Sequence, residues 1–244
     1  MSRIETAMVL AAGLGTRMRP LTNDRPKAMV EVAGRPLIDH ILERLAQAGV
    51  QRAVVNVHHF ADMVEDHLAQ RRDWPDVLIS DERAGLLDSG GGIAHALPLL
   101  GTGPIFVANI DTPWIEGPTP ALRALADRFD PAKMDIAVLL APRDRSFGFD
   151  RPEGFEMDGM GRLTHSTRAE PKSTYVNLGF QVLNPAILAG QPDPAFSIVP
   201  IWKQLAAQGR LYGAVMDGYA MHVSDPAARQ VVEDRLVAAA RDSG

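Results

Sequence analysis

Glycines and cationic side chains lie close together near the N-terminus, directly after an apolar run at residues 7–11. Gly13, Gly15 and Arg17 follow this run, and Lys27 comes soon after, behind a proline. Glycines let backbone N–H groups approach an anion, and the arginine and lysine side chains add positive charge. This arrangement at the end of a strand predicts a site that binds phosphate.

The glycine-rich loop matches neither of two better-known phosphate-binding motifs. A dinucleotide fingerprint needs a third glycine at the position of Met18, and a P-loop needs Gly-Lys-Ser/Thr after four intervening residues. For the glycines alone, a tight strand-to-helix turn with solvated arginines is the structural alternative.

A second glycine cluster, at residues 88–92, reads Asp-Ser-Gly-Gly-Gly. Successive glycines lose much backbone entropy on folding, so a closely approaching ligand explains them better than a simple turn. A flexible loop is the alternative.

An isolated acid, Asp111, follows the apolar run at residues 105–109. Open α/β sheets bind ligands at the carboxyl ends of their strands. A carboxylate there suits Mg²⁺, which proteins bind through one or two carboxylates together with substrate phosphates. A helix-capping role before Thr112-Pro113 is the alternative.

The elements that must position these residues alternate between strand and helix in the first part of the chain. This alternation predicts an α/β fold with a mostly parallel sheet and helices on both faces. The expected strands span residues 7–11, 53–57, 77–80, 105–109 and 135–141, and the expected helices span residues 37–48, 61–70, 92–100 and 121–129.

The second part of the chain has a different pattern, which suggests a small inserted lobe and closing elements. The glycines at 159 and 161 predict a hairpin turn between short strands. The expected elements are a hairpin at 155–164, a strand at 175–183, a helix at 200–208, short strands at 211–216 and 219–223, and a helix at 226–241.

Composition limits the possible classes of protein. The 244 residues are 46% hydrophobic and 23% charged, carry a net charge of −5 and contain no cysteine. The lack of cysteine excludes a disulfide scaffold, a zinc–thiolate site and a thiol nucleophile. The acidic balance argues against nucleic-acid binding.

No apolar run approaches the ~18–20 residues that cross a bilayer, and the N-terminus has no signal-peptide pattern. We therefore expect a cytoplasmic protein, a monomer or small homo-oligomer, without membrane contact.

The loop at residues 10–21, Leu-Ala-Ala-Gly-x-Gly-Thr-Arg-Met-x-Pro-Leu, is followed by Pro26-Lys27 and by Val-Ala-Gly-Arg-Pro-Leu-Ile at 32–38. This long pattern resembles the sugar-1-phosphate nucleotidyltransferases. The resemblance implies a Rossmann-like, GT-A-like fold and one domain over residues 1–244. It also implies a nucleotide-binding core at 1–140, a sugar-binding lobe at about 141–195 and closing elements at 196–244.

The implied reaction converts a nucleoside triphosphate (NTP) and a sugar-1-phosphate into a nucleotide-sugar and pyrophosphate. The segment Asp-Ser-Gly-Gly-Gly-Ile at 88–93 is similar to Glu-Thr-Gly-Gly-Gly-Ile of the N-acetylmuramate-1-phosphate uridylyltransferases. That similarity favours UTP and N-acetylmuramic acid 1-phosphate, as in peptidoglycan recycling. The alternatives are a mannose-1-phosphate guanylyltransferase, another hexose-1-phosphate nucleotidyltransferase, and a non-catalytic nucleotide-sugar sensor.

The resemblance also implies roles for individual residues. Arg17 and the backbone of residues 13–16 would hold the β- and γ-phosphates, Lys27 would neutralise the α-phosphate, and Asp111 would hold Mg²⁺. The expected nucleotide-binding residues are Leu10, Ala11, Ala12, Gly13, Gly15, Thr16, Arg17, Lys27, Asn56, Asp88, Gly90 and Gly91. The expected sugar-binding residues are Asn109, Glu170, Lys172 and Asn177.

The chain departs from the family pattern at two positions near the expected metal. Ile110 replaces a glycine, which narrows the space beside Asp111. His222 stands where the family has a second metal-binding aspartate. Because imidazole suits Mg²⁺ poorly, Mn²⁺ is possible in its place. Asp225, just before Pro226, is better explained as the N-cap of the last helix.

Overall fold

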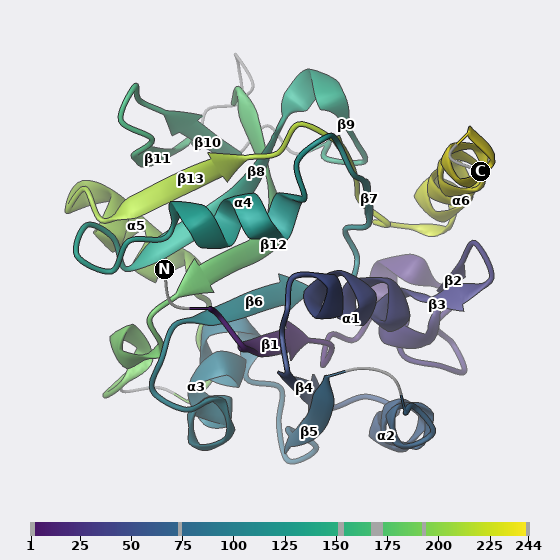
Figure 1. Cartoon of the computed structure of the whole chain (residues 1–244). Coiled ribbons are helices and arrows are strands. Elements are labelled where there is room, and N and C mark those ends of the chain that lie inside the picture. Colours follow the sequence, from purple (N-terminus) through teal and green to yellow (C-terminus); the bar gives the residue numbers. More distant parts are fainter. Residues whose placement is uncertain (1–2, 73–74, 151–153, 167–172, 192–193, 243–244) are drawn as a thin grey trace.

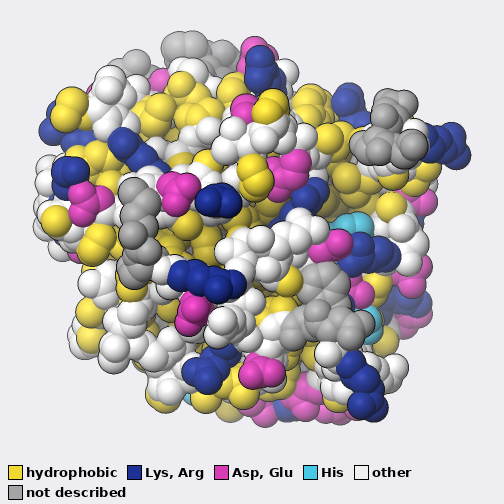
Figure 2. Space-filling view, viewed as in Figure 1, with side chains coloured by type: hydrophobic (Ala, Val, Ile, Leu, Met, Phe, Trp, Pro, Cys, Tyr) yellow, Lys and Arg dark blue, Asp and Glu magenta, His cyan; other side chains and the backbone are white. Residues whose placement is uncertain are grey.

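The fold consists of one large twisted sheet with helices on both sides (Figure 1). In the computed structural model, the described residues are 3–72, 75–150, 154–166, 173–191 and 194–242. Among these residues, no helix is both long enough and apolar enough to cross a membrane. Figure 2 shows basic and acidic side chains interspersed over one face of the molecule, whose net charge is −5.

The main sheet of the described chain has nine strands in the order β11-β10-β12-β6-β1-β4-β5, with β8 beside β12 and β13 beside β8. Strands β6, β1, β4 and β5 pair in parallel, as do β8 and β13, whereas β12 is antiparallel to both β6 and β8. The predicted mostly parallel sheet is therefore confirmed. The strands are β1 (Thr6–Leu10), β4 (Arg52–Val57), β5 (Asp76–Asp81), β6 (Ile105–Asn109), β8 (Ile136–Pro142), β10 (Gly154–Met157), β11 (Leu163–Ser166), β12 (Tyr175–Leu183) and β13 (Leu211–Val215).

Hydrophobic clusters on the two faces of the sheet hold the helices. One cluster includes side chains of α1, α2, α4 and α6, and the other includes side chains of α3 and α5. Helices on both faces were predicted, and this is confirmed. The helices are α1 (Leu37–Gln47), α2 (Ala61–Ala69), α3 (Asp88–Leu100), α4 (Ala121–Arg128), α5 (Val199–Ala207) and α6 (Pro226–Asp242).

The apolar patterns of β1 and α1 explain why these elements form. In β1, Ala7 and Val9 face one cluster and Met8 faces the other, and all three side chains are fully buried. A central parallel strand covered on both faces needs such an unbroken apolar run. In α1, the buried side chains recur at helical spacing and form a single apolar face, made by Leu37, Ile38, Ile41, Leu42 and Leu45.

Most of the short elements were not predicted from the sequence. The predicted strand at 219–223 is β14 (Tyr219–Met221), which lies at the centre of a separate sheet between β7 (Trp114–Ile115) and β9 (Ser146–Phe147). Further short elements are β2 (Glu31–Val32), β3 (Arg35–Pro36), and the 3₁₀ turns η1 (Thr16–Met18), η2 (Lys27–Met29), η3 (Arg143–Arg145) and η4 (Pro185–Leu188).

One predicted boundary was wrong: α3 begins at Asp88 rather than at Gly92. The glycines of this segment are therefore part of the helix instead of a loop before it. The predicted hairpin is present as β10 and β11, and the predicted strand at 175–183 is β12. Since β12 pairs with β6 and β8, the expected lobe continues the main sheet.

Candidate active site

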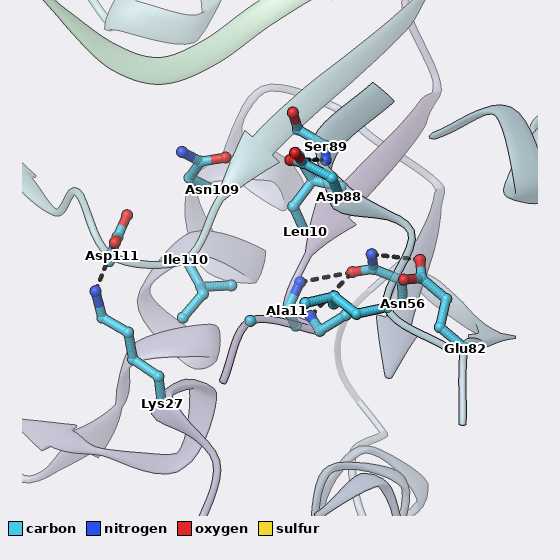
Figure 3. Close-up of a pocket in the computed structure, with 13 residues that line it drawn as sticks. Leu10, Ala11, Lys27, Asn56, Glu82, Asp88, Ser89, Asn109, Ile110 and Asp111 are labelled. Atoms are coloured by element: carbon cyan, nitrogen blue, oxygen red, sulfur yellow. Dashed lines mark hydrogen bonds and ion pairs between the residues drawn. The ribbon is translucent and has the colours of Figure 1, made fainter. Parts of the chain in front are cut away.

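A cavity of about 370 Å³ lies at the carboxyl ends of β1, β4 and β6 (Figure 3). This edge is where open α/β sheets bind ligands. The cavity brings together segments that are far apart in the sequence. It is lined by Leu10, Ala11, Ala12, Gly13, Lys27, Asn56, Glu82, Leu86, Asp88, Ser89, Asn109, Ile110 and Asp111.

The glycine-rich loop turns away from the sheet after Leu10. A Cβ at Gly13 would meet no atom within 4 Å, so this part of the loop is open to the cavity. Gly15 has a φ of +62° and lies close to Lys27. A Cβ at position 15 would lie only 3.0 Å from the Cβ of Lys27. Thr22 Oγ1 donates to the carbonyl oxygen of Gly15 at 2.8 Å. The second glycine thus serves the turn, and the first faces the cavity.

Asn56 and Glu82 form a buried hydrogen-bonded pair in the wall of the cavity. Asn56 Oδ1 accepts hydrogen bonds from the backbone N–H groups of Ala11 at 2.7 Å and Ala12 at 3.2 Å. Asn56 Nδ2 donates to Glu82 Oε1 at 2.7 Å, and Glu82 Oε2 accepts from the N–H of Leu87 at 3.2 Å. Figure 3 shows Asn56 between the backbone at Ala11 and the carboxylate of Glu82.

The second glycine cluster packs against the chain itself. The N–H groups of Gly90 and Gly91 both donate to the carbonyl oxygen of Phe196 at 2.9 Å. A Cβ at Gly91 would lie 2.1 Å from the carbonyl oxygen of Pro194. The close approach that these glycines predict is thus made by residues 194–196, and Gly90 and Gly91 do not line the cavity. Asp88 and Ser89 do line it, and Asp88 has a φ of +61°.

Asp111 is held between two basic side chains. Lys27 Nζ lies 2.6 Å from Asp111 Oδ2, and His222 Nε2 lies 3.3 Å from the same oxygen. Each of the three side chains is at most 20% exposed. Burial alone would raise the pKa of Asp111, but the His222 hydrogen bond and the Lys27 charge outweigh it and hold the pKa well below its usual range. Asp111 is therefore ionised at neutral pH.

The backbone around Asp111 is fixed from two sides. The hydroxyl of Thr112, a buried residue, donates to the carbonyl oxygen of Leu178 in β12. The N–H of Val223 donates to the carbonyl oxygen of Asp111 at 2.9 Å. Ile110 is 6% exposed and lines the cavity next to Asp111. Its side chain therefore occupies space beside the acid.

His222 is oriented by its other ring nitrogen. His222 Nδ1 lies 3.0 Å from the carbonyl oxygen of Gly148, and the ring stacks on Phe149 with centroids 5.4 Å apart. Both ring nitrogens thus face oxygen acceptors, Gly148 O on one side and Asp111 Oδ2 on the other.

A second cavity, of about 710 Å³, lies on the His222 side of Asp111. Aromatic side chains form much of its wall, and Trp202 is fixed there by a 2.9 Å hydrogen bond from Nε1 to Gln181 Oε1. The residues that line it are Arg17, Gly148, Phe149, Asp150, Gly154, Phe155, His165, Val176, Asn177, Trp202, His222, Ser224 and Asp225. Asp111 and Lys27 line the first cavity and His222 lines the second, so the contact between His222 and Asp111 links the two cavities.

Asp225 caps α6. Its Oδ1 accepts from the N–H of Ala228 at 2.8 Å, and its Oδ2 accepts from the Ser224 hydroxyl at 2.9 Å. The Ala228 N–H and the Ser224 hydroxyl hold the pKa of Asp225 below its usual value. The predicted capping role is confirmed, although Asp225 also lines the second cavity.

The predicted sugar-binding residues separate in the structure. Asn177 lines the second cavity, and its Oδ1 accepts from the N–H of Gly179 at 2.8 Å. Asn109 lines the first cavity instead. Glu170 and Lys172 lie outside the described residues.

Among the predicted phosphate-binding residues, Arg17 lines the second cavity and not the first. Gly15 and Thr16 line neither of these two cavities. Leu10, Ala11, Ala12, Gly13, Lys27, Asn56 and Asp88 all line the first, together with the metal candidate Asp111.

Several lining residues were missed in the sequence. Glu82 and Leu86 follow β5 at the carboxyl edge of the sheet, so the position of that strand was the only signal for them. Phe149 and His165 of the second cavity come from short strands or turns with no distinctive pattern.

Comparison with known proteins places the whole chain among nucleotidyltransferases. Residues 7–216 match the family model of the MobA-like NTP transferase domain. N-acetylmuramate alpha-1-phosphate uridylyltransferase of Caulobacter vibrioides is 52% identical over 238 residues, which cover 96% of this chain and 97% of that protein. The protein of the same name from Neisseria meningitidis is 48% identical over 106 residues, which cover 43% of this chain and 46% of that protein.

The fold also matches a solved structure. The crystal structure of HddC from Yersinia pseudotuberculosis, complexed with GMP-PN, superposes with a TM-score of 0.75 over 96% of this chain and 100% of that chain. At 21% sequence identity, this likeness concerns the fold alone.

Proposed function

The chain belongs to the family of MobA-like NTP transferase domains and is a sugar-1-phosphate nucleotidyltransferase. From that premise we propose that it transfers the uridylyl group of UTP to N-acetylmuramic acid α-1-phosphate. The products would be UDP-N-acetylmuramic acid and pyrophosphate. The 52% identity to the Caulobacter uridylyltransferase, spanning nearly all of both chains, supports this choice of substrates.

The observation that carries the proposal is the 3.3 Å contact between Asp111, which lines the first cavity, and His222, which lines the second. The first cavity, with the glycine-rich loop and Lys27, would hold UTP. The second cavity, with its aromatic wall and Asn177, would hold the sugar-1-phosphate. Lys27 and His222 both contact Asp111, so the α-phosphate and the sugar phosphate would face each other there. We propose to retain the domain assignment, with a core at 1–140, a lobe at about 141–195 and closing elements at 196–244. The second cavity would then combine residues of the lobe with Trp202, His222, Ser224 and Asp225 of the closing elements.

The reaction needs no nucleophile from the protein. A phosphate monoester has a second pKa of ~6, so the sugar phosphate is largely ionised at neutral pH and can attack directly. One of its oxygens would form a bond to the α-phosphorus of UTP, while the bond between that phosphorus and the bridging oxygen breaks. Pyrophosphate leaves with the bonding electron pair. Alignment and neutralisation of charge are then the tasks of the protein.

Lys27 is the cation best placed for the α-phosphate, because it lines the first cavity and lies 2.6 Å from Asp111. The open backbone at Gly13 would receive the phosphate groups on the same side. Arg17 lines the second cavity and not the first, and it remains our candidate for the β- and γ-phosphates on the grounds of the family resemblance. Asn109, Glu170, Lys172 and Asn177 remain our candidates for contacts to the sugar.

A divalent cation, Mg²⁺ or alternatively Mn²⁺, fits beside Asp111. Among the described residues there is no group of three or more metal-binding side chains. Mg²⁺, however, commonly binds through one carboxylate plus substrate phosphates rather than in a protein cage. Asp111 is ionised, and His222 turns Nε2 toward it, so these two residues would hold the cation. When bound, the cation would neutralise phosphate charge.

The proposal is tested by measuring pyrophosphate release with purified protein. UTP, GTP, CTP and dTTP are each combined with N-acetylmuramic acid α-1-phosphate, N-acetylglucosamine 1-phosphate, glucose 1-phosphate and mannose 1-phosphate, first with Mg²⁺ and then with Mn²⁺. We expect the highest kcat/KM for UTP with the muramic acid phosphate. A preference for GTP and mannose 1-phosphate would replace this assignment by a guanylyltransferase, and nucleotide binding without any release would indicate a sensor.

The expected surroundings of the enzyme follow from the same assignment. We propose that its partners are the two small-molecule substrates, that it binds neither nucleic acid nor membranes, and that it works in the cytoplasm as a monomer or small homo-oligomer. The net charge of −5 supports the expectation that the protein does not bind nucleic acid.

A further inference from the structure

The first cavity has two walls that come from distant parts of the chain. One wall is the glycine-rich loop, residues 10–13, and the other is the segment 86–89 at the start of α3. We propose that Asn56 and Glu82 are positioning residues that join these two walls into one rigid unit and thereby set the affinity for the nucleoside triphosphate. This inference rests on the proposed function, since it takes the first cavity as the nucleotide site.

The bridge is a continuous series of hydrogen bonds. From one wall, the N–H groups of Ala11 and Ala12 donate to Asn56 Oδ1 at 2.7 and 3.2 Å. Asn56 Nδ2 donates to Glu82 Oε1 at 2.7 Å. From the other wall, the N–H of Leu87 donates to Glu82 Oε2 at 3.2 Å. The Asn56 oxygen has two lone pairs and both are used, so it has no acceptor left for a ligand.

Burial makes this bridge hard to replace. Asn56 is 3% exposed and Glu82 is 2% exposed, so water does not readily take the place of a lost partner. Within the described part of the chain, no ion pair involves Glu82, and its carboxylate is stabilised by neutral donors. A buried group that loses its partner destabilises the arrangement by its full desolvation penalty.

Gly92 gives an independent sign that the space around the bridge is fixed. A Cβ at Gly92 would lie 2.8 Å from Glu82 Oε1 and 2.9 Å from Asn56 Nδ2. Both distances are shorter than a normal contact of a carbon atom with these polar groups. Helix α3 therefore packs so closely against the bridge that position 92 has no room for a side chain. The third glycine of the cluster is explained by this contact rather than by a ligand.

The test exchanges the chemical groups of the two residues. In Glu82→Gln, an NH2 group replaces one of the two accepting oxygens. Depending on the orientation of the new amide, this NH2 group faces either Asn56 Nδ2 or the N–H of Leu87, and both of these are donors. Asn56→Asp sets two carboxylates against each other across the 2.7 Å contact. The double variant restores every bond: the aspartate introduced at position 56 accepts from Ala11, Ala12 and the new amide, and the glutamine introduced at position 82 accepts from Leu87. It also restores the net charge of the pair.

We expect each single variant to raise KM for UTP roughly 10-fold or more, the effect of about 1.4 kcal/mol, with a smaller change in kcat. We expect the double variant to return KM to within roughly threefold of wild type, as coupled residues do in a double-mutant cycle. Unchanged KM in the single variants would overturn the proposal. So would a double variant whose KM shows the combined defect of both single changes, because the residues would then act separately.

Matched controls carry the same chemical changes outside the cavity. Glu43→Gln removes a carboxylate that pairs with Arg35, and Asn184→Asp alters a capping residue of η4. Both controls should keep the wild-type KM for UTP.

Calorimetric titration with UTP alone separates the two proposals. Wild-type protein that binds UTP but releases no pyrophosphate contradicts the proposed function and leaves the bridge testable through the dissociation constants of the variants.

If the variants fail to fold, hydrogen exchange on the wild-type protein tests the bridge instead. The bridge predicts that UTP protects the amides of Ala11 and Leu87 together, and protection of one wall without the other would overturn it.

Discussion

Lys27 and Asp111 depend on each other in this site. The ammonium group lies 2.6 Å from the carboxylate and keeps it ionised despite burial. His222 Nε2 lies 3.3 Å from the same carboxylate oxygen. Lys27 therefore sets a positive charge beside a single carboxylate at the first cavity, which suits a substrate with several phosphate groups.

Loss of the Lys27 charge should slow the chemical step. For Lys27→Ala we expect kcat to fall by roughly 10² or more, as when one electrostatic donor is removed from an active site. Steady-state kinetics with UTP and the sugar phosphate measure this. Lys133→Ala, which removes an exposed lysine paired with Asp130, is the control and should keep wild-type activity. An unchanged kcat in Lys27→Ala would remove this residue from the mechanism.

Helix starts shape both cavities. The glycines at the start of α3 let the helix lie against residues 194–196, and this contact places Asp88 and Ser89 at the first cavity. At the second cavity, the start of α6 is capped by Asp225. In each case, the packing or capping at the start of a helix places polar groups at the edge of a cavity.

The packing of α3 predicts a stability defect for Gly91→Ala. The new Cβ would lie 2.1 Å from the carbonyl oxygen of Pro194, which is backbone and cannot turn away. We expect the free energy of unfolding to fall by about 1–3 kcal/mol, the usual effect of overpacking. Urea denaturation measures it, and Gly103→Ala, where a Cβ meets no atom within 4 Å, is the control. Equal stability of the two variants would contradict this account of the glycine cluster.

The cap of α6 predicts a pH-dependent contribution to stability. Asp225→Ala should lower the free energy of unfolding by about 1 kcal/mol at pH 7, whereas Asp225→Asn, which keeps a capping oxygen, should change it less. Since the folded-state pKa of Asp225 is lowered, its contribution is complete above the unfolded pKa and is lost as the pH falls through the folded value. Urea denaturation of wild type and Asp225→Ala between pH 7 and 3 should therefore show the difference shrinking. A difference that grows on acidification would contradict the cap.

At the scale of the whole molecule, the order of strands brings the two cavities together. Strand β12 lies antiparallel between β6 and β8, and its irregular segment between Asn177 and Gln181 lies beside the end of β6. Gly179 there has a φ of +73° and approaches Asn109 so closely that a Cβ would lie 2.4 Å from its side-chain nitrogen. The second part of the chain is thereby joined directly to the edge where Asp111 lies.

The regular elements were predictable because each has a clear apolar pattern, which is an unbroken run in β1 and helical spacing in α1. The position of Gly13, Lys27 and Asp111 at one cavity was predictable because glycines, a cation and an acid follow strand ends in the sequence. The Asn56–Glu82 bridge and the packing of Gly90 and Gly91 against Phe196 were not. They depend on tertiary contacts between segments whose distance in space no local pattern encodes.

The most direct test of the account is identification of the product by mass spectrometry. Purified protein is incubated with UTP, N-acetylmuramic acid α-1-phosphate and Mg²⁺, and both products are quantified. The account predicts UDP-N-acetylmuramic acid and pyrophosphate in equal amounts, formed faster than the product of any other pair of substrates. Absence of this nucleotide-sugar with Mg²⁺ and with Mn²⁺, from protein that binds UTP, would contradict it.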